Sequence, residues 1–492
     1  MNSYPFKFNF FLLCIIILFS ECKKDNLDEI YGGYPVEIGN IVKNKCATSG
    51  CHFINDEHDH HSHSGHSHGD NSTILNLITW EDLFKGGMHG TVVYPFNSKF
   101  SPLFHHINTF PELGMMASPT MPLNRPPLSK EEVLKIKNWI DNGAPDINGK
   151  VFGSNVYDKI YVVNQGCDVI TVFDAKTQLP IRMIEVGSNP NVLETPHFIN
   201  FSPDGKYWYV VFINSPYLEK YDANTDKLVA RCNLDNQIDW NRIIISNDGK
   251  KGFCVAWTAN GRVFSVDLEK MQVINRMYGL YFPHGTALSK NNDTLYIAAQ
   301  TGNFFMKIDT ALTTHIDIPI DNSGSINYSS SLDAHDIFVS PDGTKLYFTC
   351  QKSNEIREFD LTTNSVSHII PVGKFPQAMA YSSKYNTLYV SCELDPNPDG
   401  VNEGSVVAIN LNTYTTQKVY VGNQPHGLCI DEKNDLLYVP NRNLSGSGVP
   451  PHHTSLCTGR NGFVSILMLP DLSILKDNIE LSVDTYFAKT RP

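Results

Sequence analysis

The chain has 492 residues, a formal net charge of −12 and 11 cysteines. This length allows at least two domains, each with its own hydrophobic core. An acidic chain lacks the basic surface that binding to nucleic acid requires, so we exclude nucleic acid as a partner.

The first 21 residues have the pattern of a secretory signal. Lys7 precedes an apolar run from Phe8 to Phe19, which is too short for a comfortable membrane span. The next residues, Ser20-Glu21-Cys22, resemble a bacterial lipoprotein cleavage site with Cys22 as the lipidated residue. An ordinary signal peptide and an uncleaved anchor are the alternatives. We expect residues 1–21 to be a lipoprotein signal peptide, and the exported protein to face the periplasm or cell surface on a lipid anchor alone.

Two thiols stand directly before an imidazole in the segment Cys46-Ala47-Thr48-Ser49-Gly50-Cys51-His52. In the C-x-x-C-H motif, both cysteines form thioethers to haem and the adjacent histidine is the proximal iron ligand. Four residues separate the thiols here, which makes the segment a less common variant of that motif. A disulfide between Cys46 and Cys51, or a zinc site that adds His52, is the alternative.

A low-complexity insert at residues 56–70 follows this motif. It mixes six histidines with serine, glycine and acidic residues, a composition that cannot build a core. Such a tract can chelate zinc, copper or nickel, and the alternative is a solvated loop extension. The histidines are His58, His60, His61, His63, His66 and His68.

Met121 is the predicted distal iron ligand, about 70 residues after His52. It lies in the segment Ser118-Pro119-Thr120-Met121-Pro122, where the prolines stiffen the backbone. Other methionines and histidines of this region compete for the role. They are Met88, Met115, Met116, His89, His105 and His106.

Helix signals flank these residues. Ser129 and Glu132 have the spacing of a capping box, Leu128 and Val133 that of a hydrophobic staple, and Gly143 suits the helix end. The expected apolar face of that helix is Val133, Ile136, Trp139 and Ile140. An earlier helix, with Ile38, Ile41 and Val42 at helical spacing, is expected to end at the thiol motif.

Residues 32–150 therefore resemble the single-haem c-type cytochrome domains that are fused to other modules in bacterial secreted proteins. The resemblance rests on Cys46, Cys51 and His52, on the Met121-Pro122 pair, and on the capped helix that runs to Gly143. It implies a small all-α domain with covalent haem c as its cofactor. Cys46 and Cys51 would be the thioether sites, and His52 and Met121 the axial ligands of the haem iron.

From about residue 155 a repeat begins. Ser202-Pro203-Asp204-Gly205 and Ser340-Pro341-Asp342-Gly343 are hairpin turns before strands, and weaker copies start near Ser246, Ser289, Ser382 and Asp431. The starts lie 42 to 51 residues apart, the length of a four-stranded propeller blade.

Seven blades result if residues 157–164 form the second strand of an incomplete first blade and residues 483–488 supply its missing strand. The strand motifs Tyr161-Val162-Val163-Asn164 and Tyr438-Val439-Pro440-Asn441 resemble those of bacterial YVTN-type propellers. This resemblance covers residues 155–490 and implies an all-β seven-bladed propeller, but it says almost nothing about function.

The repeat register predicts a ring of polar side chains at one mouth of the propeller channel. Five residues before each hairpin start, the chain has an imidazole or an amide. Such a ring could hold copper or another transition metal, or each histidine could simply form a hydrogen bond to a neighbouring blade. The residues are His197, Asn241, His284, His335, Gln377 and His426.

We also expect the insertion 443–460 to add His452, His453 and Cys457 near this rim. The remaining cysteines show no framework spacing, and several lie in expected strands, where a buried apolar thiol is the default. They are Cys167, Cys232, Cys254, Cys350, Cys392, Cys429 and Cys457.

The sequence thus predicts a multidomain, exported haem electron-transfer protein, with a cytochrome domain before a propeller. Its partner would be a redox protein or a small-molecule substrate. If the propeller mouth acts on a substrate, the protein is an oxidoreductase. The alternatives are a non-catalytic surface lipoprotein whose propeller binds a partner or ligand, and a metal-handling protein that uses the histidine tract.

Overall fold

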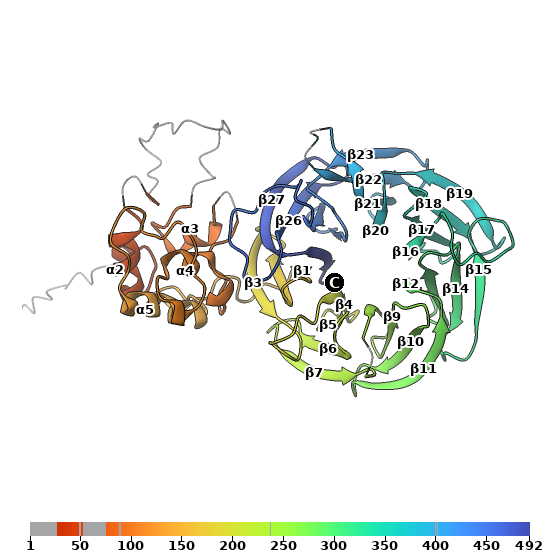
Figure 1. The fold of residues 1–492 in the computed structure, drawn as a ribbon, viewed down its shortest axis with the longest axis horizontal. Helices are drawn as coiled ribbons and strands as arrows, with labels where there is room; N and C mark the ends of the chain where they lie inside the picture. The colour runs from red at the N-terminus through yellow and green to blue at the C-terminus, as the bar shows by residue number, and fades with distance from the viewer. Residues whose placement is uncertain are drawn as a thin grey trace, which may run out of the picture.

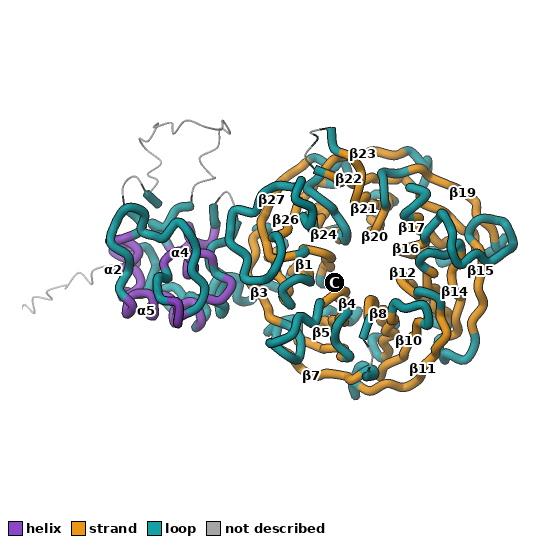
Figure 2. Tube along the Cα trace, in the orientation of Figure 1, coloured by secondary structure: helices purple, strands orange, loops and turns teal. Residues whose placement is uncertain are grey.

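The computed structural model describes residues 27–48, 51–52, 75–87, 90–236, 238–398, 400 and 402–492. In this part of the chain, helices occupy the N-terminal section and strands fill the rest. Figure 1 shows the helices as a group beside a closed ring of blades. Figure 2 shows the same division between helix and strand.

The helical part has its own hydrophobic core. Tyr34, Trp80, Phe84 and Phe104 are its largest fully buried side chains. The helices are α1 (Leu27–Tyr31), α2 (Val36–Lys45), α3 (Trp80–Lys85), η2 (Ser98–Phe100), α4 (Pro102–Ile107), η3 (Pro111–Leu113) and α5 (Lys130–Asp141).

Helix α5 begins and ends where the sequence predicts. The Ser129 side chain accepts a hydrogen bond from the Glu132 backbone N–H, and the Glu132 side chain accepts one from the Ser129 N–H. Gly143, with φ of 99°, follows the helix end. The predicted apolar face is buried. Helix α2 ends at Lys45, directly before Cys46, which confirms the second predicted helix.

The strands form seven antiparallel four-stranded sheets, each of which is one blade. The first blade has the order β28-β1-β2-β3, so the C-terminal strand closes the ring beside the first strand of the propeller. The structure confirms the seven-bladed propeller and the predicted closure. The first blade consists of β1 (Lys159–Asn164), β2 (Val169–Asp174), β3 (Leu179–Glu185) and β28 (Thr485–Thr490).

The other six blades each use four consecutive strands. The second and third contain β4 (Pro196–Phe201), β5 (Tyr207–Phe212), β6 (Tyr217–Asp222), β7 (Leu228–Asn233), β8 (Trp240–Ile245), β9 (Lys251–Ala256), β10 (Gly261–Asp267) and β11 (Gln272–Leu280). The fourth and fifth contain β12 (Pro283–Leu288), β13 (Thr294–Ala299), β14 (Phe304–Asp309), β15 (His315–Pro319), β16 (Ala334–Val339), β17 (Lys345–Cys350), β18 (Glu355–Asp360) and β19 (Ser365–Pro371). The last two contain β20 (Pro376–Ser382), β21 (Thr387–Pro396), β22 (Glu403–Asn410), β23 (Thr416–Tyr420), β24 (Cys429–Asp431), β25 (Leu436–Asn441), β26 (Asn461–Met468) and β27 (Ile474–Val483).

The helical part contacts the first and last blades, near β3, β26 and β27 in Figure 1. The Asn97 side-chain amide donates a hydrogen bond of 2.9 Å to the Met183 carbonyl oxygen. Lys99 forms an ion pair with Glu185. An apolar cluster that includes Tyr94 and Phe100 packs across the same contact. The two parts therefore meet through both polar and apolar contacts.

Candidate functional site

The helical part encloses a cavity of about 600 Å³. Its volume is in the range of cofactor and ligand sites in proteins. Most of the wall is apolar, which keeps water away from whatever the cavity holds. Side chains from α2, α3, α4, α5 and the segment around Leu77 form much of this wall. They include Ile38, Val42, Leu77, Leu83, Ile107 and Ile136.

Both cysteines of the motif line this cavity together with His52. Cys46 follows the last residue of α2, and its backbone N–H continues the helix by donating to the Val42 carbonyl. Cys46 and Cys51 are free thiols in the structure. Burial raises the pKa of the Cys46 thiol to about 11, so this side chain carries its proton at neutral pH.

One ring nitrogen of His52 lies against the backbone. Nδ1 is 3.2 Å from the Leu75 carbonyl oxygen, and the Leu77 backbone N–H donates to the His52 carbonyl at 3.0 Å. A metal-bound histidine usually donates its other ring N–H to such an acceptor, which fixes the ring and its tautomer. Coordination by His52 would therefore use Nε2.

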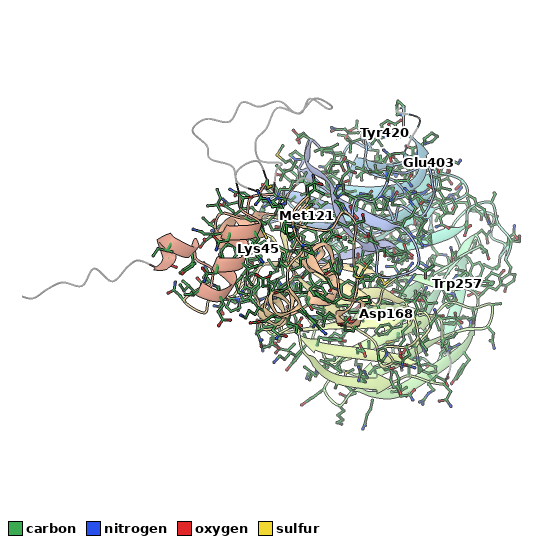
Figure 3. The ribbon with its side chains drawn as sticks, turned by 60° about the vertical axis from the view of Figure 1, so that its left-hand side comes forward. Lys45, Met121, Asp168, Trp257, Glu403 and Tyr420 are labelled. Carbon is green, nitrogen blue, oxygen red and sulfur yellow. A yellow bond between two sulfur atoms is a disulfide. The ribbon has the colours of Figure 1, made fainter. Side chains whose placement is uncertain are left out.

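Met121 also lines the cavity, and Figure 3 labels it in the helical part. Its backbone N–H donates to the His106 carbonyl oxygen at 2.7 Å. His106 lines the same cavity, and its Nδ1 lies 2.8 Å from the Pro119 carbonyl oxygen. The structure thus brings the predicted distal ligand and one of its competitors to the cavity that contains His52.

The other competitors are placed differently. His105 is buried with Nε2 2.7 Å from the Lys99 carbonyl oxygen, and it is absent from the wall of this cavity. Burial lowers the pKa of His105. Met115 and Met116 do not line the cavity either. Met88 and His89 lie outside the described residues, as do Cys22 and the histidine tract at 56–70.

The propeller contributes two further residues to the cavity, His452 and His453. The sequence predicted that they lie near the channel rim with the rest of the insertion 443–460. That prediction was wrong, because this loop packs against the helical part. No local signal could have shown this, since the position of the loop depends on how the two parts dock.

Glu480 of β27 fixes the backbone of these two histidines. Its carboxylate accepts hydrogen bonds from the backbone N–H groups of His452, at 2.8 Å, and His453, at 2.9 Å. The Asn461 side-chain amide donates to the same carboxylate. Burial raises the pKa of Glu480.

A disulfide joins Cys457 of the same loop to Cys167, between β1 and β2. It links residues 290 positions apart, so it connects the last blade to the first. The default of a buried apolar thiol does not hold for this pair. It holds for Cys232, Cys254, Cys350, Cys392 and Cys429, which are free and buried.

The predicted ring also forms at the channel. Each of its residues is the second residue of an innermost strand or, for His426, follows the bridging residue Pro425. The first five stand at register shifts in their strand pairs. A β-bulge turns the side chain of the bulged residue away from the hydrogen-bonded strand pair. This explains why the equivalent residues of different blades all face the channel.

The four imidazoles form a chain of ring contacts that Tyr486 closes. Ring centroids are 6.4 Å apart for His197 and His284, 3.9 Å for His284 and His335, and 5.6 Å for His335 and His426. Tyr486 lies 4.4 Å from His197 and 3.9 Å from His426.

Several of these rings have partners within the protein. Nδ1 of His284 lies 3.0 Å from the His335 carbonyl oxygen, and Nδ1 of His335 lies 2.9 Å from the Gln377 carbonyl oxygen. His197 contacts Gln165 and Tyr486 through its two ring nitrogens. Nδ1 of His426 is buried without a hydrogen bond.

Burial, strengthened by the charge of Arg242 or Arg442, lowers the pKa of all four histidines. The rings are therefore neutral at neutral pH. Within the described part of the chain, no group of three or more His, Cys, Asp or Glu residues is arranged to hold a metal ion. None of the described helices has the length and apolar character needed to cross a membrane.

No protein-family profile matches the chain. A curated relative, Antigen Lp49 of Leptospira interrogans serogroup Icterohaemorrhagiae serovar copenhageni (strain Fiocruz L1-130), is 22% identical over 290 residues. The match covers 56% of this chain and 60% of the relative, so the chain spans less than two thirds of that protein.

Two solved structures are similar to this chain. A functionally unknown protein from Desulfotomaculum acetoxidans DSM 771 has a TM-score of 0.51 and 15% identity, over 68% of this chain and 98% of that one. Hydrazine synthase from Kuenenia stuttgartiensis has a TM-score of 0.46 and 18% identity, over 58% of this chain and 79% of that one. At such identities the likeness to the first of them concerns the fold alone.

Proposed function

We propose that the protein is a mono-haem c-type cytochrome joined to a seven-bladed propeller, and that it transfers single electrons. The observation that carries this proposal is the shared cavity. One apolar space of about 600 Å³ has Cys46, Cys51, His52 and Met121 on its wall. These are the side chains that attach haem and ligate its iron in the cytochrome domains that residues 32–150 resemble.

The residues present fit the cofactor in three respects. The two cysteines are thiols, as attachment requires. The Leu75 carbonyl orients His52 so that Nε2 would serve as the proximal ligand. Met121 would supply its thioether sulfur on the distal side, and histidine with methionine is a ligand pair of c-type cytochromes that raises the reduction potential.

Attachment needs no oxidant. The thiols of Cys46 and Cys51 would each add across one vinyl group of the porphyrin, with the sulfur on one vinyl carbon and the thiol proton on the other. Two thiols thus account for two thioethers. Bound haem supplies an Fe(III)/Fe(II) couple. The apolar wall would limit water near a bound iron, and the contact of His52 with the Leu75 carbonyl would hold the proximal ring in place.

A pyridine haemochrome spectrum and iron analysis test this proposal on protein made with a c-type cytochrome maturation system. We expect a c-type spectrum and one iron per chain, and we expect both to be lost in Cys46→Ala/Cys51→Ala. The matched control is Cys232→Ala, which removes a buried thiol of β7 far from the motif in sequence. Wild-type protein without covalent haem would refute the proposal.

For the propeller we propose a binding role, in which it docks a redox partner or a surface ligand. The backbone contacts of His284 and His335 favour this role, because two of the four histidines then complete hydrogen bonds between blades. Copper or another metal at His197, His284, His335 and His426, with an oxidoreductase activity, is the competing hypothesis. Metal analysis of the same preparation distinguishes them, since stoichiometric copper beside iron would favour the enzyme.

We further propose export, with Cys22 as a lipid anchor. The secretory pattern of residues 1–21 supports this, and the name of the Leptospira relative, Antigen Lp49, is consistent with it. Covalent haem attachment takes place outside the cytoplasm, so export and the haem proposal agree. Metabolic labelling with a radioactive fatty acid, lost in Cys22→Ala, tests the anchor.

A further inference from the structure

The cavity wall includes side chains from both parts of the molecule. Cys46 follows α2, which Figure 1 places on the side of the helical part away from the propeller, with α4 between. His452 and His453 reach the same cavity from the propeller loop before β26. Cys46 and these imidazoles therefore approach the cavity from different elements on different sides.

The helical backbone comes close to the propeller beside these histidines. Gly87 and Gly90 form an isolated bridge on the cavity wall. Gly90 has φ of 98°, and a Cβ built there would lie 3.7 Å from the Glu480 carbonyl oxygen of β27. A side chain at this position would strain the backbone where the two parts meet. On the propeller side of the cavity, the backbone at Gly90 thus lies close to the backbone of β27.

Porphyrin chemistry fixes which end of a bound haem faces each side. Thioethers form on the vinyl groups, and the two propionates lie on the opposite edge of the macrocycle. With its vinyl edge at Cys46 and Cys51, the cofactor directs two carboxylates towards the other end of the cavity. Buried carboxylates require hydrogen-bond donors or positive charge.

The side-chain donors on the described wall are few. Tyr34 donates to backbone carbonyls and Trp139 to the Pro145 carbonyl. Lys45 stands next to Cys46 and forms an ion pair with Glu132 at 2.6 Å. Apart from the thiols and His52, the other side chains with ring N–H groups on this wall are His106, His452 and His453. Nδ1 of His106 lies 2.8 Å from the Pro119 carbonyl oxygen, and Nδ1 of His453 lies 3.8 Å from the Glu480 carboxylate. Of these three, His452 and His453 stand on the propeller side of the cavity, and a neutral imidazole has one ring N–H that can donate to a carboxylate.

We propose that His452 and His453 of the propeller receive the propionates of the haem, so that the cofactor bridges the helical part and the propeller. This inference rests on the proposed function. Glu480 and the Cys167–Cys457 disulfide hold the loop against the cavity and so position both imidazoles. The propeller then takes part in setting the reduction potential of the haem.

The potential provides a test that is independent of any activity. Donors at the propionates withdraw electron density and stabilise the ferrous state, so their loss favours the ferric state. We expect His452→Ala/His453→Ala to shift the reduction potential downwards in a spectroelectrochemical titration, with haem content unchanged. His452→Gln/His453→Gln retains N–H donors and should restore most of the wild-type value. His315→Ala, an exposed histidine of β15, should leave the potential unchanged.

The outcomes are distinguishable. Wild-type protein without covalent haem overturns the proposed function together with this inference. Haem at one per chain and an unchanged potential in His452→Ala/His453→Ala overturns the inference alone. If that variant fails to fold, the glutamine pair and the two single alanine variants decide. A wild-type potential in both single variants then overturns the inference, and a downward shift in either supports it.

Discussion

Nδ1 of His52 lies 3.2 Å from the Leu75 carbonyl oxygen. His52 and Leu75 are 23 positions apart in the chain. The orientation of the His52 ring therefore depends on a residue that follows it at a distance in the sequence. In the proposed cytochrome, Nε2 would then be the ligand atom in the cavity that His52 shares with Met121.

The first prediction concerns the proximal side. In His52→Ala the thiols still allow attachment, but the iron loses its proximal nitrogen. We expect the low-spin absorption spectrum to be lost and the yield of covalent haem to fall. Absorption and electron paramagnetic resonance spectra measure both effects, with His315→Ala as control. A wild-type spectrum in His52→Ala would refute the assignment.

The second prediction separates Met121 from His106, which share the cavity. As the proposed distal ligand, Met121 would supply a thioether that raises the potential, so we expect a high-spin ferric spectrum and a lower reduction potential in Met121→Ala. His106→Ala should retain the low-spin spectrum. Met116→Ala, whose side chain is 47% exposed, is the matched methionine control. The reverse pattern would identify His106 as the distal ligand.

Local signals explain which of these features the sequence could predict. The capping residues of α5 and the Ser-Pro-Asp-Gly turns act within a few residues, so they can be recognised without a structure. The same turns set the register of the ring that contains His335. By contrast, His453 reaches the cavity only because two separately folded parts dock, and docking leaves no local pattern.

The disulfide was hidden for the same reason. Cys167 and Cys457 are 290 residues apart, and only closure of the ring brings the first and last blades together. Sequence spacing cannot identify a pair whose proximity depends on the complete fold.

The third prediction concerns this disulfide. A crosslink that closes a long loop restricts the unfolded chain, so we expect Cys167→Ala/Cys457→Ala to lower the free energy of unfolding by about 2–5 kcal/mol. Urea titrations followed by tryptophan fluorescence measure the change. Cys232→Ala is the control for the loss of a buried sulfur atom. Equal midpoints for the double variant and this control would show that the disulfide contributes nothing to stability.

The fourth prediction concerns acid stability and the histidine ring. Burial and the charge of Arg242 lower the pKa of His335 to about 4, while the Gln377 carbonyl, Asp336 and Asp333 act in the opposite direction. His284 and His426 pack against the same ring. An unfolded histidine titrates near about pH 6.5, so between these two values the unfolded chain binds more protons than the folded one.

Stability therefore rises with pH through this window. The contribution is fully present above about pH 6.5 and is lost as the pH falls towards about 4, and for His335 alone it amounts to about 3 kcal/mol. His335→Gln retains an N–H donor for the Gln377 carbonyl but cannot take up a proton. We expect the difference in urea midpoint between about pH 7.5 and about pH 4.5 to be smaller in this variant than in the wild type. The other three ring histidines, whose pKa values are also lowered, should preserve a residual slope. An unchanged slope in His335→Gln would show that His335 does not contribute to acid unfolding.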